Sequence, residues 1–327
     1  LDSPPGRGFP KLVDALKNAP AGGPSSISFN RDYEPFARKR DAEVESGLSN
    51  LGLEIHTERD HLVIEPDELQ KDEKSGSYYQ IYTPFSRRWV ELLKSSKFQT
   101  RIESQSKGLD LLKKLAEQKN IAPLFSFTWK ECLPKSAIFE DQLENFKNKN
   151  QKHLTVAIPT AGSKAAWNCL EAFKRKLLHY QDQRDFPAQN GTSKLSLFLK
   201  NGSLTTSQVI ATLGLENPKT QKAPGPLQFL KELIWREFYY HILYHCPRVE
   251  YEAFLPKYKD IRWENREDYF EAWKEGNTGY PIVDAGMREL KQTGWMHNRV
   301  RMIVASFLTK DLLINWQWGE RFFMEKL

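Results

Sequence analysis

Apolar residues recur at helical spacing in Glu232-Leu-Ile-Trp-Arg-Glu-Phe-Tyr239 and in Gly294-Trp-Met-His-Asn-Arg-Val-Arg-Met302. At about 100° per residue, the apolar positions around each stretch gather on one face of a helix. The first stripe comprises Leu227, Leu230, Ile234, Phe238 and His241. The second, extended to about residue 315, comprises Val300, Ile303, Val304, Phe307 and Ile314. Both stretches therefore predict helices with one buried face.

Large aromatic and polar side chains fall opposite both stripes. The first helix places Glu232, Trp235, Arg236 and Tyr239 there, and the second places Trp295, Asn298, Arg301 and Met302 there. An indole that shares a face with a carboxylate and a guanidinium suits a planar ligand. Packing against other helices is the alternative, and either face alone leaves both interpretations open.

The composition is that of a globular protein of about two domains. The chain has 327 residues, of which 39% are hydrophobic and 28% charged, and a net charge of +6 that permits an anionic partner without requiring one. Cys132, Cys169 and Cys246 lie far apart without CxxC spacing, which argues against a disulfide framework and a zinc site. We expect a reducing cytoplasm. No run of about 18 apolar residues occurs, so no membrane span is predicted.

The periodicity divides the chain into three parts. Residues 1–75 alternate between helix and strand patterns, residues 76–160 are rich in Lys, Ser, Glu and Gln, and residues 161–327 are persistently helical. The predicted fold is α/β plus all-α: a partial Rossmann-like layer, a long connector and a helical domain. We expect helices at 11–18, 35–51, 83–93 and 108–117, and strands at 27–29, 53–56 and 61–64.

A polar segment, Gly191-Thr-Ser-Lys-Leu-Ser196, is predicted to open a short helix. Backbone amides and hydroxyls at such a position suit a phosphate, although ordinary capping explains the segment equally well. No GxGxxG, Walker, GxSxG or HExxH motif occurs, so those enzyme classes have no support. His241 and His245 are spaced i, i+4 without an evident third ligand, and no metal site is predicted.

Five segments in order resemble the DNA photolyase/cryptochrome family, and most closely its class I cyclobutane pyrimidine dimer photolyases. They are Tyr180-Gln-Asp-Gln-Arg-Asp-Phe-Pro187, Gly191-Thr-Ser-Lys-Leu-Ser196, Glu232-Leu-Ile-Trp-Arg-Glu-Phe-Tyr239, Thr278-Gly-Tyr-Pro-Ile-Val-Asp-Ala285 and Gly294-Trp-Met-His-Asn-Arg-Val-Arg-Met302. The resemblance continues weakly upstream, through Asp32-Tyr-Glu-Pro-Phe-Ala-Arg-Lys-Arg-Asp41 and Tyr82-Thr-Pro-Phe85.

This resemblance implies a light-driven DNA repair enzyme, a deoxyribodipyrimidine photo-lyase. Its helical domain would hold FAD, and photoexcited reduced flavin would pass an electron to a flipped-out pyrimidine dimer. The partner would be DNA that contains such dimers, and we expect a monomer. A second, antenna chromophore of the folate or deazaflavin type fits the family, but Phe36 and Ala37 replace polar antenna contacts and leave its identity open.

The resemblance also assigns residues to roles. Those that match flavin contacts are Tyr180, Thr192, Ser193, Lys194, Leu195, Ser196, Arg236, Asn298 and Arg301. Those that match DNA contacts are Glu232, Trp235, Arg236, Tyr239, Asn298, Arg299 and Met302. Catalytic roles fall to Glu232, which would hydrogen-bond the dimer, to Asn298 at the flavin edge, and to Trp263 and Trp316 as outer members of a photoreduction chain.

The chain departs from the family at both ends, which look cut. The N-terminal strand segment is missing, and the chain stops at Leu327, before the stretch that completes the flavin pocket and holds the tryptophan nearest the flavin.

Two alternatives remain. One is a cryptochrome photoreceptor, against which Asn298, Trp235 and Met302 argue. The other is a basic helical nucleic-acid-binding module without cofactor. A repair enzyme for the other ultraviolet photoproduct would carry a histidine pair near 297 and 298, and only His297 is present.

Overall fold

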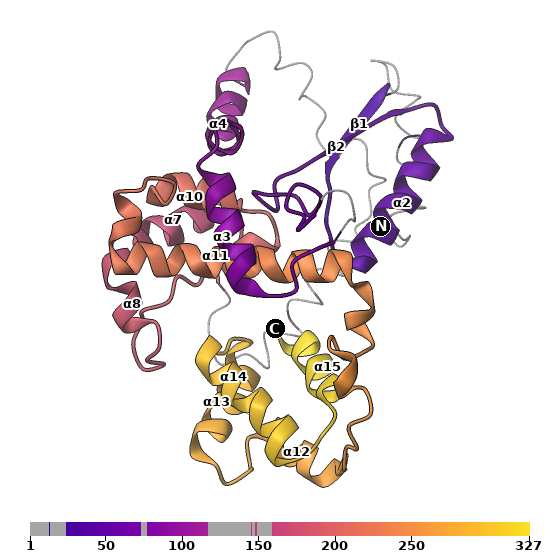
Figure 1. Ribbon diagram of the computed structural model, residues 1–327, viewed down its shortest axis with the longest axis vertical. Helices are drawn as coiled ribbons and strands as arrows, with labels where there is room; N and C mark the ends of the chain where they lie inside the picture. The colour runs from indigo at the N-terminus through magenta and orange to yellow at the C-terminus, as the bar shows by residue number, and fades with distance from the viewer. Residues whose placement is uncertain (1–12, 14–23, 73–76, 117–144, 146–147, 149–158) are drawn as a thin grey trace. The chain divides into compact units, whose positions relative to one another are not determined.

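The computed structural model describes residues 13, 24–72, 77–116, 145, 148 and 159–327 (Figure 1). The chain forms two compact units, each of which draws on separate stretches of sequence. The first unit contains Leu1–Lys135, Ala161–Asp182 and Thr192–Pro247, and the second contains Ser136–Thr160, Gln183–Gly191 and Arg248–Leu327. The division into parts at 75 and 160 stays a prediction.

The first unit begins with a β-α-β arrangement. Strand β1 (Ser26–Asn30) pairs in parallel with β2 (Glu54–Glu58), with Ser26 opposite Glu54, and helix α2 (Pro35–Ser49) connects them. Val13, Val44, Leu48 and Leu53 form the core between this helix and the strands. Pro35 suits the first turn because its missing N–H needs no partner there. The predicted α/β layer is confirmed, whereas the helix expected at 11–18 lies outside the described residues apart from Val13.

Residues 61–64, which were expected to form a strand, form a buried loop instead. Leu62, Val63 and Ile64 are completely buried, and their apolar character caused the wrong prediction. The backbone N–H groups of Val63 and Ile64 donate to the carboxylate of Glu237 rather than to a neighbouring strand. A side chain thus satisfies the donors that a sheet would otherwise have paired.

The rest of the first unit is helical and is organised around one long helix, α11 (Pro224–His245). Helices α3 and α10 and the short helices η2 and η3 contact α11, and α4 packs on α10. The bounds are α3 (Tyr82–Leu93), α4 (Ser96–Ala116), α7 (Ser163–Lys174), η2 (Leu177–His179), α8 (Tyr180–Gln183, of which Gln183 belongs to the second unit), α9 (Ser196–Lys200), α10 (Thr206–Leu213) and η3 (Thr220–Lys222).

The predicted stripe of α11 is correct at four of its five positions. Leu230, Ile234, Phe238 and His241 are buried, but Leu227 is 37% exposed. The first turn of α11 instead approaches η2 closely at Gly225. A Cβ at this residue would lie only 2.1 Å from the carbonyl oxygen of Leu177. Close approach of η2 at this glycine leaves Leu227 at the surface.

In the described part of the second unit, helices α12 to α15 (Figure 1) and a π-helical turn contribute to a core that contains Trp273. The elements of this unit are η4 (Pro247–Glu250, of which Pro247 belongs to the first unit), η5 (Pro256–Tyr258), α12 (Glu267–Glu275), α13 (Pro281–Thr293), α14 (Asn298–Ser306), the π-helix η6 (Phe307–Asp311) and α15 (Trp316–Lys326). The buried core comprises Trp273, Val283, Met287, Leu290, Met296, Val300, Val304, Phe307, Leu308 and Ile314.

The regular helix expected to continue to about residue 315 ends at Ser306, where η6 begins. Val300, Val304, Phe307 and Ile314 are buried as predicted, but Ile303 is 42% exposed. Helix α13 approaches α14 at Gly286, where a Cβ would meet Val300 and Val304, so position 303 lies to the side of this contact. No described helix is long and apolar enough to cross a membrane.

Candidate functional site

Three aromatic rings line the polar face of α11. The indole of Trp235 lies 3.5 Å from the ring of Tyr82, centroid to centroid, and the two planes differ by 3°. On the same helix Tyr239 lies 5.6 Å from Trp235 at 24°. Tyr82 comes from the first turn of α3, and its hydroxyl donates to the carbonyl oxygen of Lys231 at 3.2 Å.

Glu232 lies on this face one turn before Trp235. Its carboxylate accepts a hydrogen bond from Gln228 Nε2 at 2.8 Å. Burial, and then the charge of Glu232, raise the pKa of the Tyr82 hydroxyl to about 12. Glu232 and Trp235 are half-buried and Tyr239 is exposed, so the side chains predicted to leave the core do so.

Arg236 is held by groups of the first unit. One Nη donates to the carbonyl oxygen of His61 at 2.9 Å, and the other lies 2.8 Å from Nε2 of the same histidine. The guanidinium also lies over the ring of Tyr240, 4.9 Å from its centroid. Burial and the neighbouring Arg236 charge lower the pKa of His61 to about 4. Its assignment to flavin and DNA stays a prediction, and these contacts give it a structural role.

The segment that precedes α9 places several predicted flavin contacts together. Tyr180 is buried, with its ring perpendicular to that of Phe229 at 5.2 Å. Thr192 and Ser193 are half-buried, Leu195 is buried, and Lys194 and Ser196 are exposed.

No side chain caps α9 among the described residues, so the capping interpretation of this segment is wrong. Ser193 Oγ accepts a 3.4 Å hydrogen bond from Leu195 N. Lys194 adopts a φ of 54°, in the left-handed region that non-glycine residues seldom occupy. At α10, by contrast, Thr205 and Gln208 form a reciprocal capping box.

The start of α14 brings together the predicted residues of the second unit. Asn298 is exposed at the first helical position, with Nδ2 3.9 Å from the sulfur of Met302, which is 54% exposed. Arg299 donates through Nε and Nη2 to the two carboxylate oxygens of Asp185, at 2.7 and 3.1 Å. His297 Nδ1 accepts from Arg299 N at 3.2 Å and caps the helix.

Two buried polar atoms of this region have no hydrogen-bond partner among the described residues: Arg301 Nε and His297 Nε2. Burial lowers the pKa of the Arg301 guanidinium, and its Nη2 donates a 3.4 Å hydrogen bond to the carbonyl oxygen of Met296. Because His297 Nδ1 is an acceptor, Nε2 of the neutral ring is a donor. Two orphaned donors fit a ligand rich in acceptors, as a flavin is.

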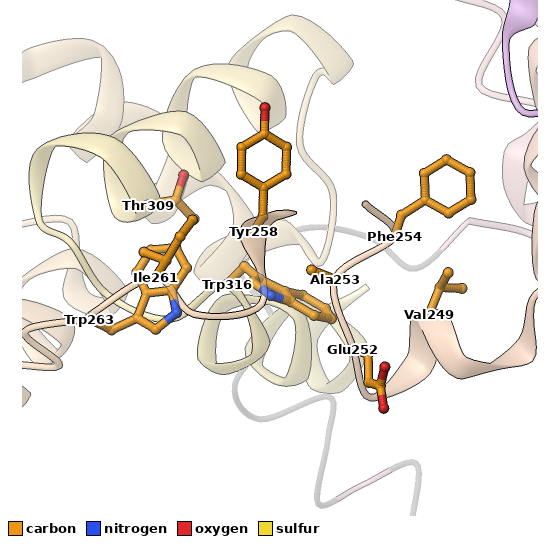
Figure 2. A pocket seen from close by; sticks show the side chains of 9 residues that line it. All are labelled: Val249, Glu252, Ala253, Phe254, Tyr258, Ile261, Trp263, Thr309 and Trp316. Atoms are coloured by element: carbon orange, nitrogen blue, oxygen red, sulfur yellow. The ribbon is translucent and has the colours of Figure 1, made fainter. Parts of the chain in front are cut away.

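Trp263 and Trp316 line one cavity of about 380 Å³ in the second unit (Figure 2). Both indoles are half-buried, and Trp316 is the first residue of α15. The other lining residues are mostly apolar: Val249, Glu252, Ala253, Phe254, Tyr258, Ile261 and Thr309. The sequence predicted the pair of tryptophans but not the cavity that they share.

Two functional features escaped the sequence analysis. Glu237 is a fully buried carboxylate on α11, and burial raises its pKa to about 7. Its position between Ile234 and His241 on the apolar stripe was the signal that could have revealed it. Asp185, the partner of Arg299, lies 114 residues away in sequence and gave no such signal.

Trp235 lies in the first unit and Asn298 in the second. Among the residues that the structure describes, no cluster of three or more His, Cys, Asp or Glu side chains could hold a metal ion.

Two family models match the chain. Residues 10–104 match the model described as DNA photolyase, and residues 229–327 match the FAD binding domain of DNA photolyase. The chain belongs to the DNA photolyase family. The second match contains Glu232, Trp235 and the start of α14, so the faces described above are part of the photolyase FAD binding domain.

Individual photolyases agree with this assignment. The chain is 36% identical to the deoxyribodipyrimidine photo-lyase of Vibrio cholerae over 310 residues, which cover 93% of this chain and 59% of that protein. It is 34% identical to the Escherichia coli deoxyribodipyrimidine photo-lyase over 302 residues, 92% of this chain and 58% of that protein. The chain thus spans about three fifths of the length of these relatives.

Solved photolyase structures show the same fold. A class III photolyase from Agrobacterium tumefaciens matches with a TM-score of 0.69 and 32% identity, over 97% of this chain and 61% of that one. An archaeal photolyase from Sulfolobus tokodaii, solved with two FAD molecules, matches with a TM-score of 0.63 and 28% identity, with the same two coverages. A Synechocystis cryptochrome has a TM-score of 0.69 at 21% identity over 99% of this chain and 62% of that chain, a likeness of fold alone.

Proposed function

We propose that this chain is the main part of a light-driven DNA repair enzyme that binds FAD and splits cyclobutane pyrimidine dimers. The observation that best supports this proposal is the polar face of α11, where Glu232 and the stacked indole of Trp235 lie within one helical turn. The bound FAD would supply the photoexcited electron. The protein's residues would bind the lesion and stabilise the charge that the lesion gains.

Trp235 would stack on the flipped dimer. Flipping a nucleotide costs a few kcal/mol, and one aromatic stack returns about 1–3 kcal/mol. Stacking alone therefore roughly balances flipping, and phosphate contacts must supply the rest. Arg299 is suited to such a contact, because its guanidinium already binds a carboxylate in the two-point geometry that a phosphate also accepts.

Glu232 would hydrogen-bond a carbonyl oxygen of the dimer and stabilise negative charge there after electron transfer. In this bond the carboxyl O–H would donate and the carbonyl oxygen would accept. In the first unit, Tyr180, the 192–196 segment and Arg236 match flavin contacts of the family. In the second unit, Asn298 and Arg301 match such contacts. The orphaned donors of Arg301 and His297 support this assignment. A cytoplasmic location fits the free thiols of Cys169 and Cys246. We also propose that the protein is a monomer.

The test has two stages. The visible spectrum of the purified protein should show a flavin, and blue light should then restore DNA that contains pyrimidine dimers. Trp235→Ala should weaken the preference for dimer-containing DNA more than it weakens nonspecific binding, because stacking supplies the share of binding that is specific to the lesion. Equal losses on both substrates would contradict this role.

Glu232→Ala should lower the repair yield per photon and leave lesion affinity within about tenfold. An unchanged yield would contradict the assigned role of Glu232. A protein that binds flavin and responds to light without restoring DNA would instead favour a photoreceptor. A protein without flavin that still binds DNA would favour a cofactor-free binding module.

A further inference from the structure

The two tyrosines next to Trp235 lie on opposite faces of its indole. Both rings are nearly parallel to the indole, with centroids 3.5 Å away for Tyr82 and 5.6 Å away for Tyr239. Two rings this close to one indole face would also contact each other, yet among the described residues Tyr82 and Tyr239 make no ring contact. Tyr82 bonds to Lys231, one turn before Trp235, whereas Tyr239 follows one turn after it. The three rings therefore form a ladder with Trp235 in the middle.

Tyr82 is fixed in this ladder. Its hydroxyl is bonded to the carbonyl oxygen of Lys231, and its ring edge meets Phe238 at 5.8 Å and 79°. The 3.5 Å separation from Trp235 is van der Waals contact and leaves no space for an inserted base. A base could reach this face only by breaking all three contacts.

Tyr239 is held much less firmly. Its side chain is 62% exposed, and within the described part of the chain its hydroxyl makes no hydrogen bond. Its ring contacts are the loose one with Trp235 and a tilted one with Phe238 at 5.7 Å. Rotation of the Tyr239 side chain into solvent would therefore cost little free energy, and it would uncover the second face of the Trp235 indole.

We propose that Tyr82 is the fixed backing of Trp235 and that Tyr239 is a displaceable cover over the face that receives a flipped pyrimidine. This inference rests on the proposed function and specifies which indole face the lesion uses. It makes Tyr82 a positioning residue, because it acts through Trp235, and it makes Tyr239 a competitor of the lesion.

The two tyrosines should therefore have opposite effects on binding. An aromatic pair contributes enough that Tyr239→Ala should tighten binding of dimer-containing DNA by about two- to tenfold, and Tyr82→Ala should weaken it by a similar factor. In both variants the change in affinity for undamaged duplex should be smaller than the change for dimer-containing DNA, because an intact duplex presents no flipped base to the indole. Tyr82→Phe keeps the ring but loses the bond to Lys231, so its lesion affinity should fall between those of wild type and Tyr82→Ala.

Equilibrium binding in the dark provides the test, since it needs no repair chemistry. Three matched oligonucleotides are compared: an intact duplex, one with a thymine dimer, and one with a single bulged thymine. Wild-type protein without preference for the dimer would count against the proposed function. The duplex with the bulged thymine would still test the ladder, because the Tyr82 and Tyr239 variants should change its affinity in opposite directions.

Weaker lesion binding by Tyr239→Ala, or unchanged binding by both Tyr82 variants, would overturn the inference. Thermal unfolding of each variant checks that the first unit remains folded. Should Tyr82→Ala not fold, Tyr82→Phe and Tyr239→Ala still give the opposite signs that the ladder requires.

Discussion

The indole Nε1 of Trp89 donates a 2.6 Å hydrogen bond to the carboxylate of Glu237, and both side chains are completely buried. The same carboxylate accepts from the backbone N–H groups of Val63 and Ile64, at 2.6 and 3.3 Å. One side chain on α11 thus holds α3 through Trp89 and the 61–64 loop through its backbone. The neighbouring turn of α11 carries Trp235, so Glu237 fixes the helix that presents the proposed lesion-binding face.

Glu237→Gln should destabilise the first unit. At pH 8, above the pKa of about 7, the carboxylate accepts three hydrogen bonds, whereas an amide brings one oxygen and two additional donors. At least one buried donor loses its acceptor, at a cost of about 1–3 kcal/mol. Urea unfolding at pH 8 measures the effect. Exposed Glu91→Gln, which removes only the surface ion pair with Arg88, is the control, and equal effects of the two variants would contradict the prediction.

Acid should destabilise the first unit through its buried histidines. Burial lowers the pKa of His241 to about 4 from 6.5, so the folded state binds fewer protons than the unfolded state between these values. Stability is lost as pH falls through this window, by up to about 1.4 kcal/mol per pH unit for one histidine. Glu237 opposes this trend because its raised pKa gives the opposite sign.

His241→Gln should therefore flatten the dependence of the unfolding free energy on pH between about 4 and 6.5. The glutamine amide keeps a donor for the carbonyl oxygen of Ile64, which His241 Nε2 contacts at 3.1 Å, but does not titrate. His179→Gln removes an exposed ring and serves as the control. An unchanged slope in His241→Gln would show that other groups dominate the acid response.

Asp185→Asn should strengthen DNA binding modestly, because the carboxylate that engages Arg299 competes with phosphate. The pKa of Asp185 is lowered by its hydrogen bond to Arg299, so the pair is charged at neutral pH. Exposed pairs contribute about 0–1 kcal/mol, which corresponds to at most about fivefold tighter binding. Fluorescence anisotropy at several salt concentrations measures this. Asp268→Asn changes the net charge equally but frees Arg266 instead, and equal gains in both variants would indicate a general charge effect.

Gly225→Ala should destabilise the first unit, because its Cβ would lie 2.1 Å from the carbonyl oxygen of Leu177 and 2.6 Å from that of Leu178. Backbone atoms cannot move aside as a flexible side chain can, so we expect a loss of about 1–3 kcal/mol. Gly108→Ala in α4 is a control of opposite sign, since nothing lies within 4 Å of its Cβ. Alanine there should stabilise the helix by about 0.5–1 kcal/mol. A stable Gly225→Ala variant would show that η2 shifts away easily.

The main elements were predictable because their signals are local. Helix α2 begins at Pro35 as expected, and the stripe on α11 placed Trp235 and Glu232 away from the core. The π-helical turn was not predictable in the same way. It interrupts the regular spacing on which the projection depends, and the tertiary contact at Gly286 leaves Ile303 exposed.

By itself the sequence determined the helical periodicity, the two polar faces and the family motifs, since each depends on residues within a few turns of one another. Only the tertiary structure decided which of these side chains contact residues distant in sequence. Trp235 meets Tyr82, Arg236 meets His61 and Arg299 meets Asp185, across separations of more than a hundred residues. The physical reason is that burial and pairing depend on what folds against a face, and a helical projection contains no information about the partner.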